Sequence, residues 1–207
     1  MKLISFTLAI SGLLSAANIN SVQADGVVAA EGEKSWGYKE NDPSMYGPSQ
    51  WGKQYPTCAG KRQSPINIPA QAALTKGTAK TPLTFAGSCS SYKLSRHEDA
   101  YKGEVQGGSC SVTANGKAYP MVQFHMHAPS EHTLNGKVYD GETHFVHQHA
   151  DGNIAVVGVF LEKKANIKTD PWFASFIGSL GNVTTTASPT VNLGAYSKLL
   201  AAAASKG

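Results

Sequence analysis

The stretch YPMVQFHMH at residues 119–127 is followed by VYDGETHFVHQH at 138–149 and NIAVVGVFL at 153–161. The first stretch alternates along the chain, and the last is an apolar run of strand length that is rich in β-branched residues. The dipeptide Asn135-Gly136 between the first two stretches is typical of a tight hairpin turn. The letters ADGN between the last two indicate another turn. Together these features predict three adjacent antiparallel strands.

Two helices are expected towards the end of the sequence. Asp170-Pro171 is typical of an N-cap and a first helical residue, and apolar side chains follow at helical spacing until Gly181. A second helix is expected from Ala195 into the alanine-rich tail. The segment 31–67 is rich in Gly, Pro, Tyr and Trp and has little periodicity, which predicts an irregular segment anchored by aromatic side chains. The sequence contains no internal repeat and no linker, which favours one domain.

The N-terminal sequence predicts export from the cell. An apolar run at 3–14 precedes Val22-Gln23-Ala24, which resembles a cleavage site with small residues. This is the pattern of a cleavable signal peptide over residues 1–24. The run is too short to span a bilayer, and no later segment approaches about 18 consecutive apolar residues. We therefore expect a secreted protein without a membrane anchor. The net charge of +4 is mild and the basic residues are scattered, which argues against nucleic acid as a partner.

Of the five histidines on two of the predicted strands, three can point to one side of the sheet. Residues two apart on a strand share a face, so Gln123, His125 and His127 point the same way, as do Glu142 and His144. If the two strands are neighbours in register, His144 lies beside the first pair. Three imidazole nitrogens then leave the fourth tetrahedral position open for water, as in a catalytic zinc site.

Two polar residues on the same faces are candidate partners for these histidines. Gln123 beside His125 and Glu142 beside His144 are placed to accept the remaining ring N–H and so to fix each tautomer. For an isolated His-x-His pair, the polar face of a half-exposed strand would be the preferred interpretation. The third histidine and the two acceptors favour a metal site.

These residues belong to a longer pattern. The run QFHMHAPSEHT at 123–133, with Gly136 and ETHFVH at 142–147, resembles the zinc signature of alpha-class carbonic anhydrases. Upstream, WGY at 36–38, GPSQW at 47–51 and QSPINI at 63–68 resemble the amino-terminal motifs of that family. The resemblance spans about residues 34 to 200. It implies a mainly β fold, in which short peripheral helices surround a large, twisted and mostly antiparallel sheet.

The resemblance also implies a cofactor and a reaction. His125, His127 and His144 would hold Zn²⁺, whose bound water ionises to the hydroxide that converts carbon dioxide to bicarbonate and a proton. Sulfonamide-type inhibitors are then expected to bind. Val146 and Val156 match positions that line the apolar carbon dioxide pocket, although ordinary sheet core is the more common role of a valine.

Three further residues acquire roles only through the family pattern. Glu131 matches a glutamate that accepts a hydrogen bond from a threonine orienting the zinc hydroxide; outside the motif it is an ordinary loop carboxylate. His132 is expected to be structural. His97 is the only upstream histidine and thus the candidate proton shuttle, but its sequence context differs from that of the family, and a solvated loop histidine is an equally good interpretation.

The family pattern departs from this sequence at the C-terminal end. It continues past a Leu-Leu element, here Leu199-Leu200, into a strand and a Gly-Ser-Leu-Thr-Thr-Pro-Pro-Cys loop, whereas this sequence stops at Gly207. We therefore expect residues 25–207 to form an incomplete domain that hydrates carbon dioxide weakly. The alternatives are a carbonic-anhydrase-related binding protein without turnover and an incomplete gene product.

The three cysteines are expected to form one disulfide and leave one thiol free. Secretion permits disulfides, but an odd number leaves at least one cysteine free or paired with another chain. In the family, a cysteine at the position of Cys58 commonly bridges to the missing loop, so Cys58 is expected to be free. Cys89 and Cys110 flank two possible adjacent strands and are expected to bridge each other.

Overall fold

A computed structural model of the protein describes residues 8–9, 34–69, 83–97 and 100–204. Apart from Leu8–Ala9, the predicted signal peptide over residues 1–24 lies outside the described residues. The chain divides into two compact units. One consists of residues 19–66, and the other contains residues 1–18 and 67–207.

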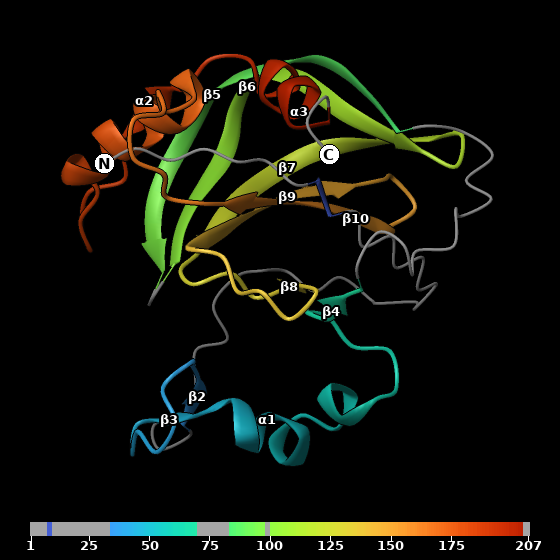
Figure 1. The fold of residues 1–207 in the computed structure, drawn as a ribbon, viewed down its shortest axis with the longest axis vertical. Coiled ribbons are helices and arrows are strands. Elements are labelled where there is room, and N and C mark those ends of the chain that lie inside the picture. Colours follow the sequence, from blue (N-terminus) through green and yellow to red (C-terminus); the bar gives the residue numbers. More distant parts are fainter. Residues whose placement is uncertain (1–7, 10–33, 70–82, 98–99, 205–207) are drawn as a thin grey trace. The chain divides into compact units, whose positions relative to one another are not determined.

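A seven-stranded antiparallel sheet forms the larger unit, with the strand order β1-β10-β9-β7-β6-β5-β11 (Figure 1). Its strands are β1 (Leu8–Ala9), β5 (Thr84–His97), β6 (Ala100–Ala114), β7 (Lys117–His127), β9 (Gly141–Gln148), β10 (Ile154–Leu161) and β11 (Thr190–Asn192). Two short strands, β4 (Asn67–Ile68) and β8 (Thr133–Leu134), pair in parallel beside it. The predicted fold class, a mainly β protein with a large antiparallel sheet, is confirmed.

The three strands predicted from the sequence correspond to β7, β9 and β10, and all three are neighbours in the sheet. β9 begins at Gly141, three residues later than predicted. The Asn135-Gly136 turn is present, with φ values of 50° and 76°, but it closes a smaller turn in which Leu134 N donates to Lys137 O. Residues 138–140 lead from that turn into β9, because Tyr139 N donates to Ser130 Oγ at 2.9 Å and not to a sheet partner.

Helices α2 (Pro171–Ser179) and α3 (Tyr196–Ala204) lie on one side of the sheet (Figure 1). As predicted, Asp170 caps α2, since its Oδ1 accepts a hydrogen bond from Trp172 N at 2.8 Å. Trp172 packs edge-on against Phe124 of β7 and Phe145 of β9, at centroid distances of 4.9 and 5.6 Å. All three rings are buried, so this side of the sheet forms the hydrophobic core.

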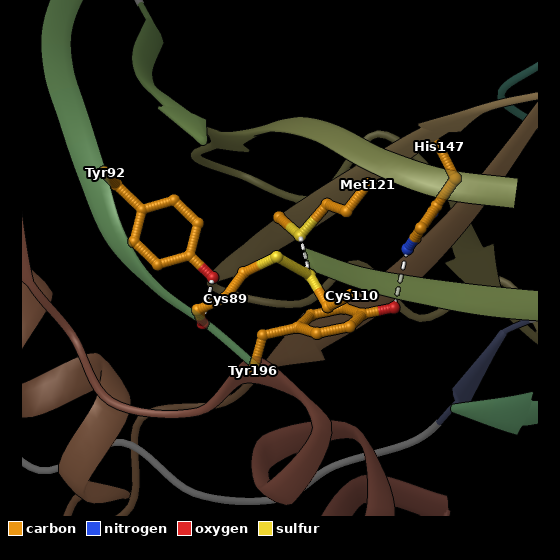
Figure 2. Close-up of a disulfide and its surroundings, with 6 residues drawn as sticks. All are labelled: Cys89, Tyr92, Cys110, Met121, His147 and Tyr196. Atoms are coloured by element: carbon orange, nitrogen blue, oxygen red, sulfur yellow. Dashed lines mark hydrogen bonds between the residues drawn. A yellow bond between two sulfur atoms is a disulfide. The ribbon is translucent and has the colours of Figure 1, made fainter. Parts of the chain in front are cut away.

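The disulfide and the start of α3 lie on the same side of the sheet (Figure 2). Cys89 and Cys110 are bonded, with their Cα atoms 5.4 Å apart, and both are buried. Tyr196 reaches back to β9, where its hydroxyl lies 2.6 Å from His147 Nε2 (Figure 2). The predicted bridge is confirmed, and Cys58 is a free, exposed thiol as expected.

A β-bulge interrupts the alternation of β7. Met121 is aligned with His147 of β9, whereas Gln123 is already aligned with Val146, so Val122 is an extra residue. Before the bulge, the odd-numbered Met121 belongs to the core, but after it the even-numbered Phe124 does. The uninterrupted alternation expected over 119–127 is therefore wrong. The bulge reverses the faces, and Gln123 and the two histidines that follow it face away from the core.

The smaller unit is described from Lys34 to Ile66. It contains the parallel pair β2 (Ser35–Trp36) and β3 (Met45–Tyr46), the helix α1 (Pro48–Gln54) and the 3₁₀ helix η1 (Pro56–Ala59). As predicted, aromatic side chains contact one another there, and the ring centroids of Trp36, Tyr38 and Trp51 lie 5.4–6.1 Å apart.

The expectation that residues 31–67 form an irregular segment is wrong, because α1 is a regular helix. This helix has Pro at its first position, and Gln50 Oε1 accepts a hydrogen bond from Gly47 N at 3.3 Å. It has no buried residue, so it carries no apolar periodicity that a sequence pattern would reveal. Among the described residues, no helix is long and apolar enough to cross a membrane.

Candidate metal centre

Three histidines converge on the side of the sheet opposite the core. His125 and His127 lie on β7, and His144 on β9 is aligned directly with His125. The centroids of the three rings are 4.9–5.2 Å apart. Each ring offers a nitrogen, and these nitrogens lie within 4.8 Å of one another. The structure thus brings together the three residues that strand periodicity predicts.

Neighbouring polar groups orient two of these rings. Gln123 Oε1 lies 2.9 Å from His125 Nδ1, which leaves His125 Nε2 for another partner. Glu142 Oε1 lies 2.9 Å from His144 Nε2, which leaves His144 Nδ1. Gln123 and Glu142 therefore lie where the sequence predicts acceptors for the ring N–H groups.

Glu142 is the centre of a buried hydrogen-bond network. Its Oε1 lies 2.8 Å from His132 Nδ1, and its Oε2 accepts from the backbone N–H groups of Glu131 and His132 at 3.0 and 2.9 Å. Burial raises the pKa of Glu142, but hydrogen bonds from His132 and His144 outweigh it and hold that pKa well below its usual range. The hydrogen bond between the His132 ring and the Glu142 carboxylate raises the pKa of His132.

The same hydrogen-bond network contains a second group of possible metal ligands. His132, Glu142 and His144 also present atoms within 4.8 Å of one another. However, the Glu142 carboxylate is already engaged by ring and backbone donors. The trio is therefore better explained as the support of the three-histidine cluster than as a separate ion site, in line with the structural role expected for His132.

The electrostatics of the cluster favour neutral imidazoles. Burial and, to a smaller extent, the neighbouring rings of His144 and His127 together lower the pKa of His125 to about 3. Burial also lowers the pKa of His127. Metal binding requires unprotonated imidazole nitrogen, so at neutral pH these side chains need not release a proton first. Three imidazole nitrogens held on two adjacent strands fit the requirements of a zinc ion.

The remaining predicted residues lie around the cluster at different distances. Glu131 is close, because its Oε2 is 3.5 Å from His127 Nε2 and 3.7 Å from His144 Nδ1. Val146 and Val156 are aligned with each other on β9 and β10 and are half-buried. Val146 is two residues beyond His144 and shares its side of the sheet.

The role of His97 as a proton shuttle remains a prediction. Its backbone is the last of β5 and is aligned with Ala100 of β6. Its side chain lies outside the described part of the structure.

A charged pair on β6 that sequence reasoning missed also borders the cluster. Lys102 and Glu104 are aligned with His125 and Gln123, and their side chains form an ion pair with an Nζ–Oε1 distance of 2.8 Å. The positive charge of Lys102 contributes to the lowered pKa of His125. In the sequence, Lys102 and Glu104 are two residues apart and would share one face of a strand. The pair was missed because no strand was predicted with bounds in this region.

Comparison with known proteins gives the class of this fold and site. Residues 46–206 match the family described as eukaryotic-type carbonic anhydrase. The chain therefore belongs to the alpha carbonic anhydrase family.

Individual relatives include alpha carbonic anhydrase 2 of Arabidopsis thaliana, which is 33% identical over 163 residues. The match covers 77% of this chain and 62% of the relative. Carbonic anhydrase 7 of Homo sapiens is 34% identical over 63% of this chain and 56% of its own length. The chain thus spans about six-tenths of the length of these curated relatives.

Solved structures give the same result. The alpha carbonic anhydrase of Aspergillus oryzae superposes with a TM-score of 0.63 at 31% identity, over 77% of this chain and 66% of that one. The enzyme from Thermovibrio ammonificans, solved in complex with the inhibitor sulfanilamide, has a TM-score of 0.54 at 40% identity, over 62% of this chain and 56% of that one.

Proposed function

We propose that this protein catalyses the zinc-dependent, reversible hydration of carbon dioxide to bicarbonate and a proton. The observation that carries the proposal is the direct alignment of His125 with His144, which gathers three imidazole nitrogens within 4.8 Å on one side of the sheet. Membership of the alpha carbonic anhydrase family supports the choice of reaction.

His125, His127 and His144 would hold the ion. A zinc ion at such a site lowers the pKa of water and so supplies a nucleophile near neutral pH, as is established for carbonic anhydrases in general. The contacts from Gln123 and Glu142 would keep His125 Nε2 and His144 Nδ1 directed at the ion. Because both strands belong to the central part of the sheet, the ligands would need little rearrangement on binding.

The surroundings of the cluster suit a small apolar substrate. Val146 and Val156 form a cross-strand apolar pair on the side of the sheet that carries His144. We propose that carbon dioxide lies against this pair. We also propose that sulfonamides bind at the same place, since the Thermovibrio ammonificans relative binds sulfanilamide.

Metal analysis and carbon dioxide hydration test this proposal. The purified chain should contain about one equivalent of zinc, and His125→Ala and His144→Ala should lose most of it because a site of three histidines has no spare imidazole. His149→Ala is the matched control, since His149 lies just beyond β9 and outside the cluster. Hydration by the zinc-loaded chain, measured by stopped flow, should be inhibited by sulfanilamide.

Two results would contradict the proposal. Unchanged zinc content in both histidine variants would exclude these ligands. A fully zinc-loaded chain without hydration activity above that of His144→Ala would instead exclude the reaction while leaving the metal site intact.

We further propose that the protein is exported and that residues 1–24 are removed, so that the mature sheet would lack β1 (Leu8–Ala9). The apolar run at 3–14 supports a signal peptide, and the Cys89–Cys110 disulfide is typical of an oxidising compartment. N-terminal sequencing of the mature protein should begin near Asp25. A mature chain that retains Met1 would overturn this proposal.

A further inference from the structure

One tripeptide of the sequence has no part in the proposed metal site. Of the asparagines in the chain, only Asn182 precedes a hydroxyl residue by two positions, in Asn182-Val183-Thr184, which is the acceptor pattern for N-linked glycans. The tripeptide begins at the last residue of the 3₁₀ helix η3 (Leu180–Asn182), directly after α2. We propose that Asn182 carries an N-linked glycan. The inference rests on the proposed export, because this pattern is used in secreted proteins.

The Asn182 side chain is available for modification. It is exposed, and in the described part of the structure its amide has no hydrogen-bond partner. The surface beside it is open as well, since a Cβ atom added at Gly178 or Gly181 would meet no described atom within 4 Å. A glycan is bulky and extends into solvent. This surface can therefore accommodate one without the displacement of a neighbouring side chain.

The backbone around Asn182 is held by the residues that follow it. Val183 is buried, and its N–H donates to Leu180 O at 3.1 Å. Thr184 Oγ1 accepts a hydrogen bond from Ala187 N at 2.9 Å, and Thr184 N donates to Ala187 O at 3.0 Å. The amide of Asn182 makes no contribution to this turn. A modified or substituted side chain at position 182 should thus leave the fold intact.

The tripeptide belongs to the side of the sheet opposite the histidine cluster. It follows α2, which packs through Trp172 on Phe124 and Phe145 (Figure 1). These two rings alternate along their strands with His125 and His144 and so face the other way. A glycan at Asn182 would extend from the helical side of the sheet, and zinc binding should be the same with and without it.

The modification is a glycosyl transfer to nitrogen. Its donor is an oligosaccharide that is joined through a diphosphate to a lipid. The Asn182 Nδ2 atom forms a bond to the first carbon of the sugar, while the bond from that carbon to the diphosphate oxygen breaks. The lipid diphosphate leaves, and the amide nitrogen loses one proton. The amide that is free in the structure is therefore the only group of this chain that changes.

Secretion of the full chain, residues 1–207, from cultured eukaryotic cells tests the inference. The secreted protein should lose mass on treatment with a peptide-N-glycosidase, which removes N-linked glycans and converts the modified asparagine to aspartate. Peptide mass spectrometry should locate this conversion at position 182. Asn182→Gln keeps an amide but lacks the acceptor pattern, so its mass should not change on treatment.

Substitutions of Thr184 provide matched controls in which Asn182 is retained. Thr184→Ser preserves the acceptor pattern and should keep the glycan, whereas Thr184→Val has nearly the same volume without the hydroxyl and should lose it. The zinc content of the secreted parent should equal that of Asn182→Gln. A lower zinc content that is restored by the glycosidase would contradict the position of the glycan opposite the histidines.

The outcomes separate this inference from the proposals on which it rests. If the chain is found in the medium but the glycosidase leaves its mass unchanged, Asn182 is not modified although export stands. If the chain stays in the cell and retains Met1, the export proposal fails and the inference fails with it. A loss of mass that persists in Asn182→Gln would place the glycan elsewhere and overturn the assignment. None of these results depends on hydration activity.

Discussion

His147 Nε2 lies 2.6 Å from the hydroxyl of Tyr196, so a histidine on the core side of β9 binds the first residue of α3. His147 Nδ1 lies 3.3 Å from the carbonyl oxygen of Ala155 on β10. A neutral imidazole that donates from Nδ1 to this carbonyl can accept the tyrosine proton at Nε2. The contact therefore joins the sheet to the C-terminal helix through two defined proton positions.

Tyr196→Phe should lower the free energy of unfolding by about 1–3 kcal/mol, because a buried ring nitrogen loses its donor while the aromatic packing is kept. Chemical denaturation at neutral pH provides the measurement. Tyr101→Phe removes a hydroxyl from another ring that packs against the core, and its effect should be smaller. Equal effects of the two substitutions would show that the His147 contact contributes nothing of its own.

The stability of the metal-free chain should fall as the pH is lowered towards 4. Burial lowers the pKa of His147 from 6.5 to about 4, so the unfolded chain takes up a proton at a higher pH than the folded chain does. The stability due to neutral His147 is complete above about pH 6.5 and is lost on acidification to about pH 4, at a cost of about 3 kcal/mol. His147→Gln should remove this part of the pH dependence. Parallel stability curves for the two proteins, from pH 7 to 4, would contradict the expectation.

Gln123→Ala should weaken zinc binding about 10–100-fold, because His125 would lose the group that fixes its tautomer. Competition with a chromogenic chelator measures the affinity. The exposed Gln148 at the end of β9 supplies the control variant Gln148→Ala, which should bind zinc as the parent does. An unchanged affinity in Gln123→Ala would mean that the sheet alone orients the ring.

Replacing Cys89 and Cys110 together by Ala should destabilise the fold by about 3 kcal/mol on the chain-entropy model, given their separation of 21 residues. Thermal unfolding with and without reductant gives the comparison. Cys58→Ser should have little effect, since this thiol is exposed and unbridged. If reductant lowered the stability of the double variant as much as that of the parent, the effect would not come from this bridge.

Much of the central sheet could be predicted because it has strong local signals. The apolar run of β10 and the residue pairs two apart on β7 and β9 define strands and faces without any knowledge of partners. The capped helix α2 was predicted for the same reason, from Asp170 and the apolar spacing that follows it.

Other features depend on contacts that no local pattern encodes. The strands β5 and β6 contain Gly87, Gly107 and Gly108, which weaken a strand signal although the two strands pair along most of their length. The helix α1 has no buried face to detect. The proximity of Glu131 to His127 arises from a loop whose backbone is held by Glu142, ten or eleven positions along the chain.

The bulge at Val122 has a consequence for how this sequence tolerates insertions and deletions. Because one extra residue separates the core-facing part of β7 from its histidines, a deletion of Val122 would put the two parts of the strand back in phase. Met121 and Phe124 would then stay on the core side and His125 on the opposite side, because Gln123 would follow Met121 in regular alternation. Position 122 should therefore tolerate the loss of its residue, whereas a one-residue deletion between Phe124 and His127 would exchange the faces of the residues that follow it.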